Sequence, residues 1–200
     1  MQLSPAELRG RNDARFDPAA VGSNPVLRQM LSLEQASLQE LQLIRESLSP
    51  LPPGLDIPRN GLGRQVALAL RLIGSDACPP VLQLAQGGYD THANQLPRHG
   101  RVLSKLAAAL AAFANGLERL PHRPQVTLLA ISEFGRRLSE NGSRGTDHGS
   151  ASVAMLFGDQ LPDRLLGSYP SLNSLDERGD LIPSLSPQDL YRRVLLFSGL

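Results

Sequence analysis

The sequence predicts an α/β protein in which helices cover a mainly parallel β-sheet. Residues 81–85 form a short apolar run, and residues 125–131 form a longer apolar run rich in β-branched side chains. Between them, residues 101–120 are rich in leucine and alanine and end at Pro121. A strand, a helix and a second strand in this order are typical of a parallel sheet with a crossover helix.

The remaining elements are predicted from periodicity and from residues that start or stop helices. Pro25 suits the first turn of an amphipathic helix, and Gly74 suits the end of a more apolar one. Ser186 is a plausible N-cap for a final helix. We expect a poorly structured segment at residues 1–24 and a single domain at 25–200. Within that domain we expect helices at 25–48, 62–73 and 187–200 and a third strand at 151–158.

Composition excludes several classes of protein. The net charge is +1, from 20 Lys and Arg against 19 Asp and Glu, so we expect no nucleic-acid partner. No apolar run is long enough to span a membrane, and the N-terminus lacks a basic-then-apolar export pattern. Cys78 stands alone in an apolar run, so we expect an inert core residue.

A first polar cluster follows the predicted strand at 81–85. The turn at Gly87 and Gly88 exposes Asp90 and His92, whose carboxylate and imidazole are suitable ligands for a divalent metal. Alternatively, Asp90 caps the next helix and His92 hydrogen-bonds the backbone. His99 either covers the same edge of the sheet or faces solvent.

A second cluster follows the predicted strand at 125–131. Glu133 is placed to bind a metal, and Arg136 to bind an anion such as phosphate or sulfate through its planar guanidinium. Alternatively, the two side chains pair with each other and close a turn. His148, which lies in a predicted loop at 141–149, is either a ligand or a loop-stabilising residue. Because ligand sites lie at the carboxyl ends of strands in open α/β sheets, we expect these residues to converge.

Three motifs together resemble the bacterial domain of unknown function 1501 family, which is related in fold to alkaline phosphatases, sulfatases and cofactor-independent phosphoglycerate mutases. The resemblance covers about residues 25–200. It implies a three-layer α/β/α sandwich with a metal-assisted site for phosphate or sulfate esters. The motifs are Gly87-Gly-Tyr-Asp-Thr-His-Ala-Asn-Gln, Ser132-Glu-Phe-Gly-Arg followed by Asn141-Gly-Ser, and Gly145-Thr-Asp-His-Gly.

The resemblance implies metal ligands at Asp90, His92, Glu133 and His148. Phe134 stands where the superfamily places a further histidine ligand, which departs from the two-metal pattern. Family members usually carry an N-terminal half with an export signal and the nucleophile region. The resemblance therefore implies that this chain is the C-terminal portion of an exported, periplasmic protein, with a fold incomplete at its N-terminus and no assignable nucleophile.

Two functional hypotheses follow from these residues. The first is a metal-dependent hydrolase of a small-molecule or polymeric oxyacid ester, using zinc, manganese, magnesium or calcium. The second is a non-catalytic binding or assembly protein, or a truncated fragment, that keeps the fold. The residue pattern specifies neither the substrate nor the oligomeric state.

Overall fold

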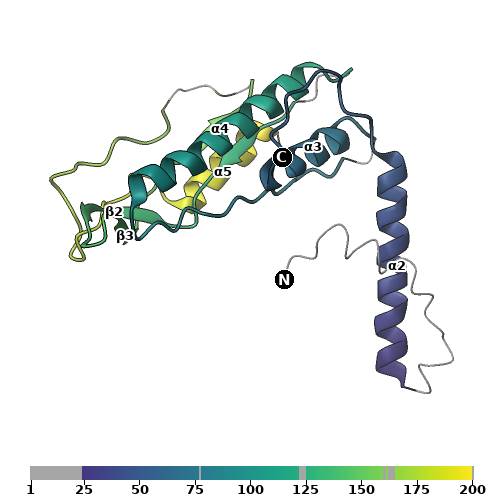
Figure 1. Ribbon diagram of the computed structural model, residues 1–200, viewed down its shortest axis with the longest axis horizontal. Helices are drawn as coiled ribbons and strands as arrows, with labels where there is room; N and C mark the ends of the chain where they lie inside the picture. The colour runs from purple at the N-terminus through teal and green to yellow at the C-terminus, as the bar shows by residue number, and fades with distance from the viewer. Residues whose placement is uncertain (1–23, 77, 122–124, 160, 162–164, 200) are drawn as a thin grey trace. The chain divides into compact units, whose positions relative to one another are not determined.

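The chain has a mixed α/β structure in a computed structural model that describes residues 24–76, 78–121, 125–159, 161 and 165–199 (Figure 1). It divides into two compact units, Met1–Leu48 and Ser49–Leu200. The predicted segment 1–24 lies outside the described residues except for Asn24. The elements in chain order are α2 Pro25–Ser47, α3 Gly61–Ile73, α4 Gln95–Glu118, β1 Leu128–Ala130, β2 Gly135–Glu140, β3 Thr146–Gly149, β4 Met155–Phe157 and α5 Pro187–Ser198.

Helix α2 belongs to the first unit and begins as its sequence predicts. The side chain of Asn24 accepts hydrogen bonds from the backbone amides of Val26 and Leu27, and Pro25 occupies the first turn. None of its residues is buried, and Val26 and Met30 remain 66% and 62% exposed. The apolar residues that predict an amphipathic helix are therefore exposed in the structure.

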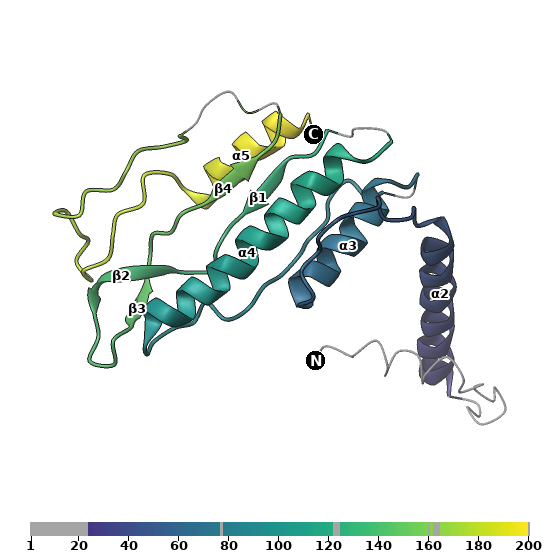
Figure 2. The same cartoon turned by 45° about the horizontal axis from the view of Figure 1, so that its top comes forward.

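The core of the second unit lies between α3 and α4, which run side by side (Figure 2). Leu70 of α3 is fully buried, and a Cβ added at Gly116 of α4 would collide with its side chain. A glycine at this position lets the two helices approach closely despite its low helix propensity. The buried cluster consists of Val66, Ala69, Leu70, Ala109 and Phe113.

The predicted strand at residues 81–85 has no regular secondary structure and pairs with no strand among the described residues. Leu82 and Leu84 pack against the helical core, while Val81 is 71% exposed. The side-chain amide of Gln65 bonds both the N–H and the C=O of Ala85, each at 2.8 Å. A side chain thus supplies the hydrogen bonds that a neighbouring strand would otherwise make.

The expectation of a parallel sheet was wrong for the strands that the structure describes. Strand β1 pairs antiparallel with β4, with Leu129 opposite Leu156, and β2 pairs antiparallel with β3. The chain leaves β1, reverses direction in the β2–β3 hairpin and returns along β1 as β4 (Figure 2). A hairpin connection gives antiparallel pairing, whereas parallel pairing needs a crossover between the two strands. A three-layer sandwich is likewise not present in the described part of the chain.

The β2–β3 hairpin corrects the prediction of a plain loop at residues 141–149. Its register places Gly135 opposite Gly149 and Arg136 opposite His148. A Cβ at Gly135 would collide with the backbone of Ala151, so only glycine fits this approach. The sequence of β2 does not indicate a strand, because it contains two arginines, a serine and a glutamate in place of a run of apolar or β-branched residues.

Helix α5 begins as predicted. The Oγ of Ser186 accepts a hydrogen bond from the backbone N–H of Asp189 at 3.1 Å, and Asp189 lies in the first turn. An acidic side chain there also interacts favourably with the helix dipole. Over the described residues, no helix combines the length and the apolar character needed to cross a bilayer.

The prediction for Cys78 was wrong, because its side chain is exposed. The residue follows the end of α3 and precedes Pro79 and Pro80, which are exposed as well. Apolar neighbours in the sequence do not bury a residue when the chain at that point runs over the surface.

Candidate metal centre

Asp90 and His92 lie in the segment that connects residues 81–85 to α4. Thr91 between them is 1% exposed, whereas the side chains of Asp90 and His92 are 61% and 47% exposed. The preceding Gly88 has a φ of +99°, a conformation that residues with a side chain rarely adopt. The segment therefore buries its threonine and presents a carboxylate and an imidazole to solvent.

The turn between β2 and β3 fixes this segment by docking on the first residues of α4. The backbone amides of Asn94 and Gln95 donate to the carbonyls of Ser143 and Arg144 at 3.0 and 2.9 Å. Asn94 itself makes no side-chain cap, so carbonyls from the turn take up these amides at the start of the helix. A Cβ at Gly145 would collide with the backbone of His92, which shows how closely the two segments approach.

This docking brings His148 of β3 to Asp90 and His92. The Nε2 atoms of His148 and His92 lie 2.8 and 2.9 Å from the same carboxylate oxygen, Oδ1 of Asp90. One ligand atom from each of the three residues lies within 4.8 Å of the others. The three side chains are about half exposed, so the cluster is open to solvent.

The other nitrogen of His92 is held by a second carboxylate. Its Nδ1 lies 3.2 Å from Oδ1 of Asp147, and the side-chain amide of Asn141 donates to the same oxygen at 3.3 Å. Asn141 also donates to the carbonyl of His92 at 3.0 Å. A carboxylate on the far nitrogen of an imidazole is the usual arrangement around metal-binding histidines, because it fixes the ring and its tautomer.

The electrostatics of the cluster favour the ionised carboxylates. The hydrogen bond from His148 lowers the pKa of Asp90, and the nearby charges of His92 and Arg136 act in the same direction. The hydrogen bonds from Asn141 and His92 lower the pKa of Asp147. Because a carboxylate oxygen only accepts hydrogen bonds, each Nε2 facing Asp90 must carry a proton or share a metal ion with it.

These lowered pKa values predict a loss of stability in acid. The unfolded chain binds protons at the ordinary aspartate pKa of about 3.9, above the folded values, so the stabilisation is complete above this pH and disappears as the pH falls through the folded values. We expect the Asp90→Asn and Asp147→Asn double variant to show a weaker decline of the urea midpoint as the pH falls below the ordinary aspartate pKa of about 3.9. Asp56→Asn, which changes an exposed carboxylate of the same unit, should keep the wild-type decline. An unchanged slope in the double variant would contradict the prediction.

Arg136, which the sequence assigns to an anion, is directed towards the protein backbone. Its guanidinium donates to the carbonyl of Thr146 at 2.6 Å and to that of Tyr89, and it lies 3.5 Å from Oδ1 of Asp90. The side chain is only 16% exposed. Arg136 therefore ties the Asp90 segment to β3 and adds positive charge beside the cluster.

Two other predicted residues lie apart from the cluster. Glu133 is exposed in the connection between β1 and β2, is absent from the group of converging ligand atoms, and makes no ion pair with Arg136 among the described residues. His99 lies in α4 with its ring edge-on to Tyr89 at a centroid distance of 5.8 Å. The structure thus joins Asp90, His92 and His148 and leaves Glu133 and His99 outside.

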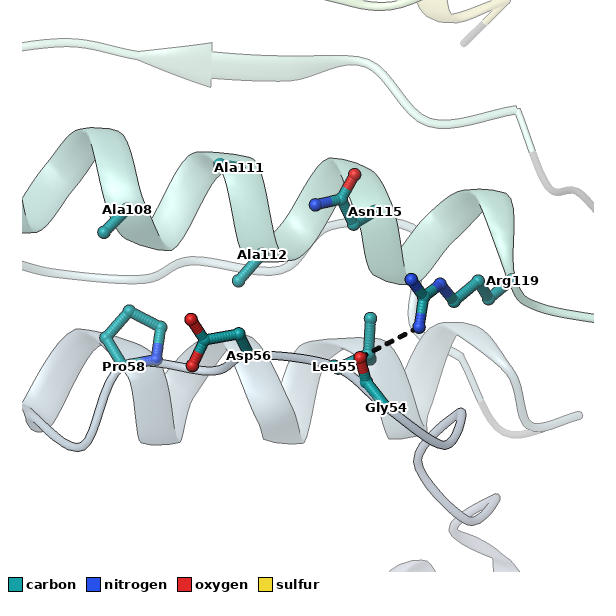
Figure 3. A pocket seen from close by; sticks show the side chains of 9 residues that line it. All are labelled: Gly54, Leu55, Asp56, Pro58, Ala108, Ala111, Ala112, Asn115 and Arg119. Carbon is teal, nitrogen blue, oxygen red and sulfur yellow. Dashed lines mark hydrogen bonds between the residues drawn. The ribbon is translucent and has the colours of Figure 1, made fainter.

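A groove in the second unit lies away from these residues. It has a volume of about 540 Å³ and runs between α4 and the segment around Asp56 (Figure 3). One wall consists of Ala108, Ala111 and Ala112, and Arg119 at one end donates to the carbonyls of Pro53 and Gly54. The residues that line the groove include none of the converging metal ligands, so we place the candidate site at the exposed cluster of Asp90, His92 and His148.

Asp147 and Asn141 contact the cluster although neither is predicted from the sequence as a site residue. Both lie in the predicted loop at 141–149, which in the structure forms the turn and the second strand of the β2–β3 hairpin. Their contacts with His92 depend on this hairpin. The available signal was Asn141-Gly142, a pair typical of tight turns between strands. Recognising that turn would have placed Asp147 and His148 on the returning strand.

Comparison with known proteins identifies a family for the chain. Residues 12–168 match the family model described as a protein of unknown function (DUF1501), and no curated protein or solved structure matches. The matched stretch covers more than half of the chain and includes Asp90, His92 and His148. The chain therefore belongs to the DUF1501 family of proteins of unknown function.

Proposed function

We propose that this chain binds one divalent metal ion through Asp90, His92 and His148, and that the site serves hydrolysis of phosphate or sulfate esters. The observation that carries the proposal is the convergence of two imidazole nitrogens on one carboxylate oxygen, with distances of 2.8 and 2.9 Å. Three protein ligands with an accessible remaining position are typical of catalytic rather than structural metal sites.

The ligand set favours zinc or manganese over magnesium or calcium. Magnesium and calcium prefer sites made only of oxygen ligands, whereas imidazole suits zinc and other transition metals. Asp147 supports the same assignment, because its contact with Nδ1 of His92 leaves Nε2 for the metal. Glu133, which the sequence predicts as a ligand, is not one of the three converging residues and is left out of the proposed site.

The chemistry of a bound divalent ion would be to polarise the ester oxygen and stabilise the charge that develops on it. The residues of this chain contribute binding and orientation. Asp147 orients His92, and Arg136 holds the Asp90 segment against β3 through the carbonyls of Tyr89 and Thr146. The hydroxyl of Ser132 donates to the carbonyl of Phe134 at 2.7 Å, so we assign it no role as a nucleophile.

The proposal includes the fold that the resemblance implies, an alkaline-phosphatase-like three-layer sandwich. Residues 81–85 support it, because Leu82 and Leu84 pack against the helical core as residues of a buried strand would.

A second candidate function is metal binding without catalysis. The observation that favours it is the engagement of Arg136, whose guanidinium donates to two backbone carbonyls and is mostly buried. With its guanidinium engaged in this way, Arg136 would not bind the anionic group of an ester at the metal. The two candidates share the metal site and differ in turnover.

Metal binding is tested by calorimetry of the 200-residue chain with zinc and manganese chloride. We expect one ion per chain in the wild type and a loss in Asp90→Asn that exceeds the roughly 10–100-fold typical of outer-shell substitutions. Asp56→Asn, an exposed carboxylate in the same unit, should bind like the wild type. Equal binding by Asp90→Asn and the wild type would refute the site.

Catalysis is tested with p-nitrophenyl phosphate and p-nitrophenyl sulfate in the presence of the same ions. Metal-dependent turnover that is absent in His148→Ala supports the hydrolase. Stoichiometric metal binding without turnover supports the non-catalytic alternative for this chain. Turnover that persists in His148→Ala would come from another site or a contaminant and would contradict the hydrolase assignment.

The role of Asp147 gives a graded prediction. Asp147→Asn should weaken zinc binding by about 10–100-fold without abolishing it, because the neutral amide no longer fixes the tautomer of His92. Calorimetry at one pH measures the change, with Asp159→Asn as a matched aspartate outside the converging group. A variant that binds zinc as tightly as the wild type would show that Asp147 is only a neighbour of the site.

A further inference from the structure

We propose that Phe134 is a positioning residue that holds the imidazole of His148 in its metal-binding orientation. The inference rests on the proposed metal site and adds a residue that is itself no ligand. The rings of Phe134 and His148 are stacked, with centroids 3.9 Å apart and planes inclined by 10°. The stacked imidazole directs Nε2 to Oδ1 of Asp90 at 2.8 Å.

The two histidines of the cluster are held in different ways. His92 is fixed through its second nitrogen by Asp147, whereas Nδ1 of His148 has no hydrogen-bond partner among the described residues. An imidazole held at one nitrogen alone can rotate about its bond to the rest of the side chain. Stacking on Phe134 restricts that rotation, so the aromatic ring takes the place of a second hydrogen bond.

Phe134 is itself anchored on two sides. The Oγ of Ser132 donates to its backbone carbonyl at 2.7 Å, and the guanidinium carbon of Arg136 lies 4.9 Å from its ring centroid. Arg136 is held by the carbonyls of Tyr89 and Thr146. A cation over an aromatic face is attractive and helps to fix the ring. The ring is thus coupled to both segments that carry metal ligands.

A purely structural role fits Phe134 less well. The residue is not part of the buried cluster between α3 and α4 and is only partly buried. Its ring contacts the exposed imidazole of His148, which is 47% accessible, rather than the apolar interior. Removing the ring should therefore disturb the orientation of His148 more than the stability of the unit.

The test uses Phe134→Leu, which removes the aromatic ring, and Phe134→Tyr, which keeps it. We expect zinc binding by calorimetry to weaken about 10–100-fold in Phe134→Leu, as for other outer-shell changes, and to recover in Phe134→Tyr. The ring protons of His148 should show an upfield ring-current shift in NMR spectra of the metal-free wild type and Phe134→Tyr, and lose it in Phe134→Leu. Phe157→Leu, at a partly exposed phenylalanine of β4, is the control.

The outcomes separate this inference from the proposed metal site. If the wild type binds no zinc, the metal site fails, while the ring-current shift still reports whether the stack exists. A shift that is the same in Phe134→Leu and the wild type would overturn the stack. A lost shift with unchanged zinc affinity would overturn the positioning role. Weaker zinc binding in both Phe134→Leu and Phe134→Tyr would also contradict the positioning role, because the aromatic ring kept in Phe134→Tyr should restore the zinc affinity.

Discussion

Replacing Leu70 with alanine is expected to lower the free energy of unfolding of the second unit by about 2–5 kcal/mol. Leu70 is fully buried between α3 and α4, and its side chain fills the space that Gly116 leaves open. The truncation removes buried apolar surface and leaves a cavity that two packed helices cannot close completely. Because the buried cluster is small, this loss is a large part of the stability of a typical domain.

Urea unfolding followed by circular dichroism measures this change. Leu68→Ala is the matched control, since Leu68 lies in the same helix but is 48% exposed. The control should alter the midpoint little, because alanine is a good helix former and little buried surface is lost. Equal effects of the two substitutions would mean that the α3–α4 contact does not form the core.

Replacing Gly145 with alanine should destabilise the turn between β2 and β3 and also weaken metal binding. A Cβ at this position would collide with the backbone of His92 and Ala93, which cannot yield as a flexible side chain would. Overpacking of this kind costs about 1–3 kcal/mol. Since the collision separates the segment of His92 from the strand of His148, the metal ligands should move apart as well.

Gly142→Ala is a close control in the same turn, because a Cβ there meets nothing within 4 Å. We expect its urea midpoint and zinc affinity to match those of the wild type. For Gly145→Ala, both quantities should fall together. Wild-type zinc affinity in a destabilised Gly145→Ala would show that docking of the turn stabilises the fold without placing the ligands.

Helices α2, α3 and α5 follow from short-range signals in the sequence. Helix α4 begins at Gln95, before the predicted segment 101–120, and the amides at its start bond carbonyls of the distant β2–β3 turn. Asn24 and Ser186 cap α2 and α5, and Gly74 ends α3, all through contacts within a few residues. Such contacts are similar in any tertiary setting, so a local sequence window suffices to predict them. The closeness of Asp90 and His92 is equally local, because a single residue separates them.

The pairing of the strands was not predictable in this way. The apolar runs at β1 and β4 indicate strands, but their direction depends on the connection between them, which is a polar hairpin instead of a helix. The run at 81–85 has the composition of a strand, yet Gln65 rather than a second strand satisfies Ala85. The hydrogen-bond partners of a strand come from elsewhere in the chain, so they cannot be predicted from the residues of the strand itself.

The sequence by itself determined helices α2, α3 and α5, the closeness of Asp90 and His92 in one loop, and the family motifs that contain His148. Only the tertiary structure decided that His148 joins this pair from 58 positions away, that Glu133 does not, and that Asp147 and Phe134 contact the two imidazoles. The reason is physical. Capping depends on neighbouring residues, whereas the meeting of the three ligand atoms depends on the β2–β3 turn docking on α4, which involves backbone groups far apart in the chain.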